Sequence, residues 1–324
     1  MAKWEFPEGR PKELFEDIDA LAPEAKRLIK DQHVVSKVVL KGFAEKTGKN
    51  SELQLTPFDL NLGREKRSRG TDGCGKIDHF LLYASESAEL LWKRVEDHAS
   101  EAITAARAGG ILQDDRLVSN IKDLIALHFV RSPRSLLVHN ESVSRTYHSV
   151  RQEVLKTKSD LLRQEFRRRY GLEPAGPQAL ELVLDDSMSR WQELSKQGAI
   201  ARASMENMFR RVRATFQASA LEVFHAPNDR EFLISDSPAF TYRYKNNNGV
   251  IEPNLAIGDS HGVAMPIAHD CLVGIGASPR EEEFSISNVR LFNELQVIVG
   301  FDYVYYRPGS GLRTFVESVN SRMP

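Results

Sequence analysis

The chain has 324 residues, of which 41% are hydrophobic and 27% are charged. It is long enough to bury a sizeable core in one elaborate domain or two conventional ones. Its 44 Lys and Arg almost balance its 45 Asp and Glu, so bulk charge draws it neither to nucleic acid nor to a membrane. Cys74 and Cys271 are too few for a disulfide framework, and no apolar run is long enough to cross a bilayer. We therefore expect a cytoplasmic protein without a cofactor.

The first 84 residues mix helix and strand patterns. Apolar residues at helical spacing predict a short helix over 11–23. Residues 36–43 are rich in valine, yet their apolar spacing fits one helical face, which favours a helix. Residues 51–63 alternate as in a strand, which Pro57 assigns to a sheet edge. A charged, glycine-rich loop follows.

Residues 85–218 carry a series of helical patterns. A helix over 85–110 ends at two glycines, and a second over 114–132 ends before Pro133. Three further helical patterns follow. We expect this helical middle to pack as an antiparallel bundle through a shared apolar stripe. The stripe consists of Leu91, Val95, Leu117, Ile121, Leu124 and Ile125.

Strand patterns return after Leu221, and a last helix and a last strand follow them. Because strands cluster instead of alternating with helices, the sequence predicts an α+β fold. We expect residues 1–84 and 219–324 to share one mainly antiparallel sheet, with 85–218 as a helical bundle. The segments expected in the sheet lie around Leu53, Leu221, Phe232, Val263, Leu272 and Val304.

Two glycine-rich motifs are better explained as loops than as sites. "GTDGCGKI" (70–77) has P-loop spacing, but Ile77 stands where Ser or Thr must hold magnesium, and no strand precedes it. "GDSHG" (258–262) places Asp, Ser and His side by side, whereas a catalytic triad assembles from separate segments. Its flanking glycines indicate a turn. The nine histidines show no helical metal-binding spacing, so we expect no metal site.

Arginines concentrate on two of the predicted helices. The two clusters are Arg163, Arg167, Arg168 and Arg169, and Arg202, Arg210, Arg211 and Arg213. The simpler interpretation is a solvated face whose cations pair with nearby glutamates and complement the helix dipole. The alternative is a surface that binds the phosphates of RNA or a nucleotide, which guanidinium groups suit well.

The segment "EFLISDSPAF" (231–240) has the clearest features of a site. A short apolar strand delivers Ser235 and Asp236 at its end, and Pro238 then forces the chain to leave the sheet. Strand ends are where rigid scaffolds present reactive groups. A local turn, in which Asp236 accepts hydrogen bonds from the amides that follow it, explains the same pattern. Both interpretations stay open at this point.

Five segments in chain order resemble one bacterial family, domain of unknown function 4238. "DQHVVSKVVLKGFA" resembles its opening Asn-Gln-His-x-Val-Pro-Gln motif, "LHFVRSPRS" its Arg-Thr-Pro-x-Arg, and "FLISDSPAF" its Thr-Ser-Asp-x-Pro. "AMPIAHDCLVGIG" stands where the family has Pro-Leu-Ser-Pro, and "NVRLFNELQVIVGFDYVYY" resembles its closing helix and strand. The correspondence runs over residues 31–306, which is most of the chain.

The chain departs from these motifs at Asp31, Ser36–Lys37 and Ile267–Ala268, where the family has Asn, Pro-Gln and Leu-Ser. The matching positions are Gln32, His33, Arg131, Pro133, Arg134, Ser235, Asp236, Pro238 and Asn293. Because the family has no established activity, the resemblance implies positions and no mechanism.

The matched polar residues suggest one enzymatic hypothesis. We expect Gln32–His33 to lie next to Arg131 and Ser235–Asp236, since each stands at the boundary of an element. The set then provides a proton-transfer group, anion binders and a carboxylate, which suits metal-independent phosphodiester cleavage. His33 is the expected general acid or base, with Asp236 and Ser235 beside it as catalytic residues. Asp236 orients the imidazole in this hypothesis.

The expected substrate-binding residues are Gln32, Arg131, Arg134 and Asn293. The hypothesis is thus a nuclease-like enzyme that acts on RNA or a nucleotide, as a toxin or a defence protein. The alternative is a non-enzymatic module that binds nucleic acid or a protein partner. In that case the same residues form a structural polar network.

Overall fold

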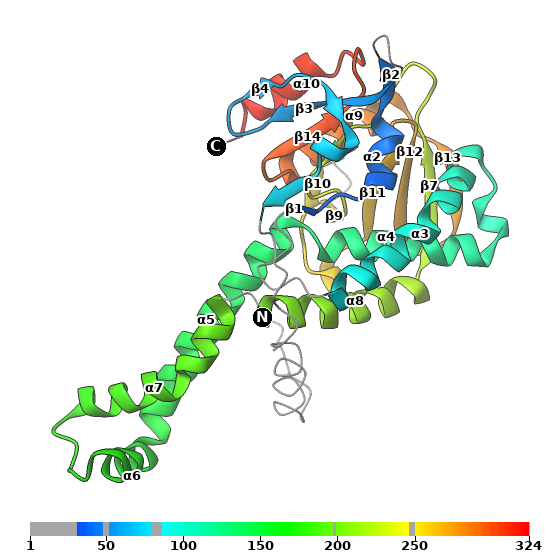
Figure 1. Ribbon diagram of the computed structural model, residues 1–324. Helices are drawn as coiled ribbons and strands as arrows, with labels where there is room; N and C mark the ends of the chain where they lie inside the picture. Colours follow the sequence, from blue (N-terminus) through cyan, green and yellow to red (C-terminus); the bar gives the residue numbers. More distant parts are fainter. Residues whose placement is uncertain (1–30, 48–51, 79–85, 197–198, 246–249, 324) are drawn as a thin grey trace. The chain divides into compact units, whose positions relative to one another are not determined.

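The computed structural model describes residues 31–47, 52–78, 86–196, 199–245 and 250–323 (Figure 1). These residues form two compact units. The smaller unit consists of described residues between 136 and 204, and the larger unit contains the others. The helix expected over residues 11–23 lies outside the described part of the chain.

The larger unit contains a six-stranded sheet in the order β10-β9-β11-β12-β7-β13. All its neighbours are antiparallel except β13, which runs parallel to β7. Apolar side chains on both faces make β11 and β12 almost wholly buried. In sequence order the strands are β7 (Ala220–His225), β9 (Phe240–Lys245), β10 (Val250–Pro253), β11 (Gly262–Ala268), β12 (Cys271–Gly276) and β13 (Arg280–Glu283).

A second sheet joins the two ends of the described chain in the order β2-β3-β14-β8, with β4 and β5 also paired to β3. Its strands are β2 (Glu45–Thr47), β3 (Glu52–Asp59), β4 (Arg64–Glu65), β5 (Arg69–Gly70), β8 (Ile234–Ser235) and β14 (Tyr303–Tyr306). A third, two-stranded sheet consists of β1 (Asp31–His33) and β6 (Lys76–Asp78).

The α+β class and the mainly antiparallel pairing are therefore confirmed, but the expectation of one shared sheet is wrong. The strand around Leu53 pairs with the one around Val304, as predicted. The strands around Leu221, Val263 and Leu272 form the other sheet instead. A short connection explains the difference. β11 and β12 are separated by two residues and pair as a hairpin, and the other edge of β12 then pairs with β7.

Pro57 does not place its strand at an edge, because β3 has partners on both sides. The carbonyl of Pro57 accepts from the amide of Lys66 at 2.8 Å, in the interval between β4 and β5. A strand residue directs its N and its C=O to the same side. Pro57 has no N–H to donate. It stands on β3 where the pairing with β4 has ended and the pairing with β5 has not begun, so no ladder hydrogen bond is lost.

The two helices that carry the predicted stripe are α3 (Glu86–Ala108) and α4 (Asp115–Val130), and they pack together. Asp114 caps α4 by accepting from the amides of residues 116 and 117 at 2.9 and 3.1 Å. The stripe on α4 is confirmed, since Leu117, Ile121, Leu124 and Ile125 are all buried. The side chain of Leu91 lies outside the described part, and Val95 is half-buried.

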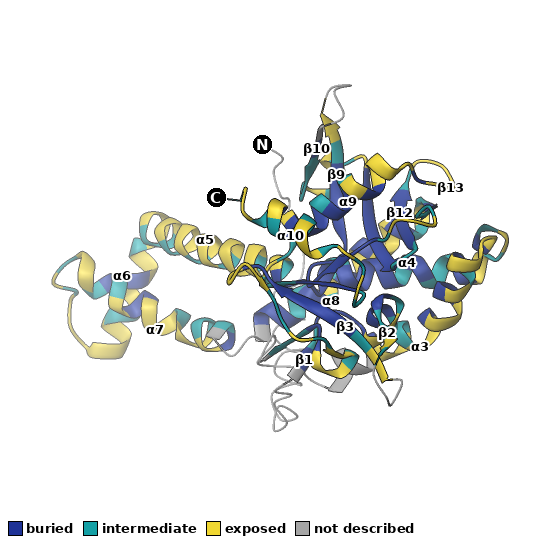
Figure 2. Ribbon diagram, turned by 90° about the horizontal axis from the view of Figure 1, so that it is seen from above, coloured by how far each residue is buried: buried dark blue, intermediate teal, exposed yellow. Residues whose placement is uncertain are grey.

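Two further helices cover parts of the first sheet and position later features. On α9 (Ile286–Val299), the Phe292 ring lies 6.3 Å from that of Phe240 on β9. The short α2 (Lys37–Leu40) continues into the 3-10 turn η2 (Lys41–Phe43), where a side chain on Gly42 would meet the carbonyl oxygen of Ile267 at 2.6 Å. The predicted helix over 36–43 is thus confirmed. Figure 2 shows that burial concentrates in the strands of this unit.

The remaining helices include α8 (Ala199–Ala218), which contributes to both units, and α10 (Arg313–Asn320), which was not predicted. The short turns are η3 (Thr71–Gly73), η4 (Ile111–Gln113) and η5 (Ile257–Asp259). The motif "GDSHG" therefore spans η5 and the start of β11, which agrees with the predicted turn.

The smaller unit is helical. It contains most of α5 (Pro133–Thr157), all of α6 (Ser159–Tyr170) and α7 (Pro177–Lys196), and the beginning of α8. Leu162 on α6 packs with Leu180, Val183 and Leu184 on α7 in a small apolar cluster. Most residues of α5 and α6 are exposed (Figure 2), so this unit has a thinner core than the larger one.

Candidate functional site

The glycine-rich loop holds the strand that carries His33. His33 on β1 lies opposite Lys76 on β6. Directly after the strand, the amides of Val34 and Val35 both donate to the carbonyl oxygen of Gly75, at 2.8 and 3.2 Å. Gly75 has a φ of +63°, which favours glycine. The loop therefore fixes the position of His33 through its backbone, and the P-loop signature is a turn.

Arg131 is the second matched residue in this region. It follows the last turn of α4, and its amide donates to the carbonyl of Leu127. The side chain is only 5% exposed. Its Nη1 donates to Glu96 Oε1 at 3.0 Å, and the guanidinium group lies over the ring of Trp92, 4.7 Å from the centroid. An ion pair and a cation–π contact therefore hold this buried cation against α3.

Ser36 and His128 extend the same polar network. The Ser36 hydroxyl donates to Glu96 Oε1 at 2.6 Å, and the Ser36 amide donates to His128 Nε2 at 3.0 Å. His128 Nδ1 lies 3.0 Å from the carbonyl oxygen of Leu124. Since Nε2 accepts, Nδ1 carries the proton and the ring is neutral. Burial lowers the pKa of His128 to about 4, which agrees with that tautomer.

His33 itself has an unusual environment. Its ring is half-buried, and its Nε2 is shielded but has no hydrogen-bond partner among the described residues. Burial, followed by the charges of Lys37, Lys76 and Arg131, lowers the pKa of His33 to about 4, while Glu96 acts in the opposite direction. At neutral pH the site thus combines a neutral imidazole with three nearby cations.

Asp236 has a different environment. It is buried, and its carboxylate accepts from the backbone amides of Phe301, Asp302 and Tyr303 at 2.7, 2.7 and 3.0 Å. Burial raises the pKa of Asp236 to about 6, although the three amide donors favour the ionised form. The carboxylate therefore fixes the turn between α9 and β14. The local-turn interpretation is wrong in its partners, because these donors come from residues 301–303 and not from the amides that directly follow Asp236.

The side chains near Asp236 also bond to the backbone. Gln296 Oε1 accepts from both the amide and the hydroxyl of Ser235, each at 2.8 Å. Asn293 accepts from the amide of Leu233 at 2.9 Å and donates to the carbonyl of Glu231 at 2.8 Å. Together they attach the segment 231–236 to α9. The side chain of Gln296 was not singled out from the sequence, although it lies three residues after Asn293 on the same helix.

One buried tyrosine links the two regions. The hydroxyl of Tyr305 on β14 accepts from the amide of Gly75 at 3.0 Å, and Tyr305 is paired with Ile234 on β8. His33 also lies near Arg131, whose charge lowers the pKa of its imidazole. Within the described residues, no hydrogen bond or ion pair joins His33 directly to Asp236. The expected orientation of the imidazole by Asp236 stays a prediction.

The other two predicted binding residues have contrasting positions. Gln32 is buried within β1. Arg134 is exposed in the first turn of α5, and no described residue forms a hydrogen bond or an ion pair with it. Arg134 is therefore available to a ligand, whereas Gln32 belongs to the packed part of the region.

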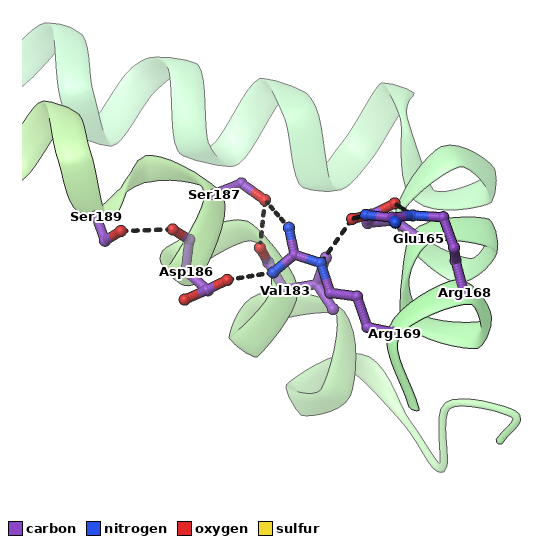
Figure 3. Close-up of polar contacts among 7 residues, drawn as sticks. All are labelled: Glu165, Arg168, Arg169, Val183, Asp186, Ser187 and Ser189. Atoms are coloured by element: carbon purple, nitrogen blue, oxygen red, sulfur yellow. Dashed lines mark hydrogen bonds and ion pairs between the residues drawn. The ribbon is translucent and has the colours of Figure 1, made fainter. Parts of the chain in front are cut away.

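The first arginine cluster is extensively paired with carboxylates. Arg168 and Arg169 both donate to Glu165, and Arg169 also pairs with Asp186 on α7 (Figure 3). Hydrogen bonds from the two arginines lower the pKa of Glu165 to about 2. This pattern favours the interpretation of a solvated, charge-paired face.

The second cluster is more varied. Arg213 donates to both carboxylate oxygens of Asp123 at 2.8 and 3.0 Å, and Arg202 is buried. Arg210 and Arg211 are exposed. The predicted phosphate-binding role of these clusters stays a prediction.

Residues that could bind a metal do not cluster in this structure. Within the described ranges, no group of three or more His, Cys, Asp or Glu side chains is arranged to hold an ion. The helices in those ranges are also too short or too polar to cross a bilayer. Cys74 and Cys271 are both buried and unbonded to each other.

The fold and these two polar regions define an α+β protein in which most of the matched residues lie at element boundaries, with Asn293 in the middle of α9 as the exception. A family model covers residues 31–310, and its description is "Protein of unknown function (DUF4238)". The chain belongs to this family. No curated protein and no solved structure matches it. The resemblance noted from the sequence motifs is thereby confirmed.

Proposed function

We propose that the protein is a nuclease-like enzyme that cleaves RNA or a nucleotide phosphodiester without a metal, with His33 as the acid–base residue. The unbonded Nε2 of His33, placed among three cations, is the observation that carries the proposal. A buried polar atom without a partner is rare in folded proteins and needs an explanation. A substrate group supplies the missing partner.

The charges near His33 suit an anionic substrate. Lys37, Lys76 and Arg131 all lower the pKa of the imidazole, whereas Glu96 raises it. Two of these cations also pair with carboxylates, Lys37 with Asp72 at 2.5 Å and Arg131 with Glu96 at 3.0 Å. A phosphodiester bound among these cations would offset their effect and bring the pKa of His33 back towards its ordinary value. Arg134, exposed three residues after Arg131, can contribute a second guanidinium to the phosphate.

RNA provides its own nucleophile for such a site. The neutral His33 takes the proton from a 2′-hydroxyl, and the 2′-oxygen forms a bond to the adjacent phosphorus. The bond from phosphorus to the 5′-oxygen breaks, and that oxygen leaves with a proton from the imidazolium or from water. The products are a 2′,3′-cyclic phosphate and a 5′-hydroxyl. The cations stabilise the charge that develops on the phosphoryl oxygens.

A specific observation favours the alternative of a non-enzymatic module for the C-terminal matched residues. Ser235, Asp236 and Asn293 bond to backbone groups or to Gln296, so their contacts suffice to explain them as structural. The proposal therefore assigns the chemistry to the region of His33. It leaves Asp236 with a positioning role through the turn before β14.

The direct test is cleavage of a mixed-sequence RNA in the presence of EDTA. We expect products that end in a cyclic phosphate, and a rate that falls by about 10²–10⁴-fold in His33→Asn. The control is His148→Asn, which changes an exposed histidine of α5. Arg134→Ala should weaken substrate binding more than it lowers the rate at saturation. Full activity of His33→Asn, or no cleavage by the unmodified protein, would overturn the proposal.

A further inference from the structure

A second buried polar atom without a hydrogen-bond partner among the described residues is Glu222 Oε2. It lies on the face of the first sheet that packs against α9. Glu222 on β7 lies opposite Gly274 on β12, and Tyr242 on β9 lies opposite Gly262 on β11. Residues opposite each other share a face of the sheet. Val263 pairs with Ile275, so Gly262 and Gly276 are adjacent across β11 and β12.

Glu222 has one carboxylate oxygen without a partner. The residue is 5% exposed. Its Oε1 accepts from Arg280 Nε at 3.0 Å, whereas Oε2 is shielded and forms no hydrogen bond with any described residue. The carboxyl group lies directly over Gly276, where a Cβ would overlap it. The glycine therefore makes room for a carboxylate whose second oxygen accepts no hydrogen bond from the part of the chain that the structure describes.

Tyr242 supplies a donor next to this acceptor. The residue is 4% exposed, and its hydroxyl lies 3.0 Å from the position of a Cβ on Gly262. No described residue forms a hydrogen bond with that hydroxyl. Burial raises the pKa of Tyr242, and the charge of Glu222 raises it further, so the phenol keeps its proton. Two buried groups over adjacent glycines thus offer one donor and one acceptor.

An exposed aromatic surface lies beside the pair. The Tyr244 ring is 5.7 Å from that of Tyr242, and it stacks with His261 at 6.1 Å between centroids. Tyr244 is 49% exposed. On the opposite side, the Arg280 guanidinium lies over the Phe224 ring, 4.8 Å from the centroid. The donor and acceptor are therefore flanked by flat groups on which a planar ligand can stack.

We propose that this end of the sheet binds a nucleobase. The base edge donates a hydrogen bond to Glu222 Oε2 and accepts one from the Tyr242 hydroxyl, and the base stacks on Tyr244. Each common nucleobase carries an adjacent donor and acceptor on its Watson–Crick edge, and every base has a face for stacking. This proposal does not depend on the role of His33, because a nucleoside without a phosphate can occupy the site.

The experiment is a calorimetric titration of the full chain with uridine, cytidine, adenosine and guanosine. We expect saturable binding of at least one nucleoside, weakened at least tenfold in both Glu222→Gln and Tyr242→Phe. Tyr242→Phe keeps the ring, so it separates loss of the hydroxyl from loss of folding. The matched control is Tyr170→Phe on the exposed surface of α6, which should bind as the unmodified protein does.

The outcomes separate the two proposals. His33→Asn should bind nucleosides normally, even if it has lost RNA cleavage. Absence of binding for all four nucleosides at millimolar concentration, or equal binding by the variants, would overturn the inference. So would a high-resolution structure in which a single water bridges Glu222 and Tyr242 and added nucleoside leaves it in place.

Discussion

The regions around His33 and Asp236 contain similar kinds of residue but use them differently. Each region contains one carboxylate that accepts several hydrogen bonds: Glu96, in the middle of α3, and Asp236, directly after β8. Asp236 is saturated by three backbone amides. Glu96 is 30% exposed and binds side chains, while the neighbouring imidazole of His33 has an unbonded nitrogen. The comparison teaches that a shared family motif can stabilise the fold in one place and leave reactive groups in another.

The largest expected effect is a loss of stability in the region of Asp236, whose carboxylate accepts hydrogen bonds from three backbone amides. Asp236→Ala leaves three amides without an acceptor, and we expect it to lower the free energy of unfolding by about 3–5 kcal/mol. Chemical denaturation measures this change. Asp229→Ala, at an exposed carboxylate, is the control and should differ little. A loss below about 1 kcal/mol for Asp236→Ala would remove the distinction between the regions.

The two regions should respond to acid with opposite sign. The folded-state pKa of His128 is about 4, below its unfolded value, so its contribution is full above pH 6.5 and is lost as pH falls towards 4. This amounts to about 3 kcal/mol. The pKa of Asp236 is raised to about 6, so protonation of Asp236 favours the folded state between pH 6 and 4.

Nuclear magnetic resonance checks these pKa values residue by residue. The ring signals of His33 and His128 should begin to move only as the pH approaches 4. A midpoint near 6.5 for His128 would mean that its ring is not held neutral between Ser36 and Leu124. The same midpoint for His33 would show that the three cations and burial do not act on it.

A smaller loss of stability is expected in the charged network. Glu96→Gln keeps a hydrogen-bond acceptor but removes the charge opposite the buried Arg131. We expect a loss of about 1–3 kcal/mol, reduced by the partial exposure of Glu96 to solvent. Glu101→Gln, which alters an exposed pair with Arg116, is the control. An equal effect of the two substitutions in thermal denaturation would contradict the role of Glu96.

The smallest effect on stability is expected at His33. Its Nε2 forms no hydrogen bond with the described residues, so His33→Asn removes no bond at that atom. We expect the free energy of unfolding to change by less than about 1 kcal/mol. A calorimetric scan that shows a loss comparable to that of Asp236→Ala would assign His33 to the structural network.

The sequence predicted the elements more successfully than their long-range contacts. Helical spacing and terminal glycines located α3 and α4, and the family motifs located His33, Arg131 and Asp236. The role of Glu96 could not be predicted, because its hydrogen-bond partners Ser36 and Arg131 come from distant segments of the chain. The local sequence pattern contains no sign of these contacts. The only local signal at Glu96 is the spacing of four residues from Trp92, which places both on one face of α3.

Sheet membership was hard to predict for a related reason. An alternating or continuous apolar pattern identifies a strand but does not identify its partner, as for the strands around Leu53 and Val263. Pairing is decided by the short connection between β11 and β12 and by the interruption opposite Pro57. The two-residue separation of β11 and β12 can be read from the sequence, but the interruption opposite Pro57 cannot be recognised before the partners of β3 are known.

The most direct measurement follows the ring resonances of His33 in a titration with inorganic phosphate at pH 6, and then in pH titrations with and without saturating phosphate. If the cations near His33 form an anion site, the signals will shift saturably, and the pKa of His33 will rise from about 4 by one unit or more. The signals of His128, already bonded on both nitrogens, will change little. Rings that do not respond to phosphate, or a response of His128 alone, would contradict an anion-binding role for this region.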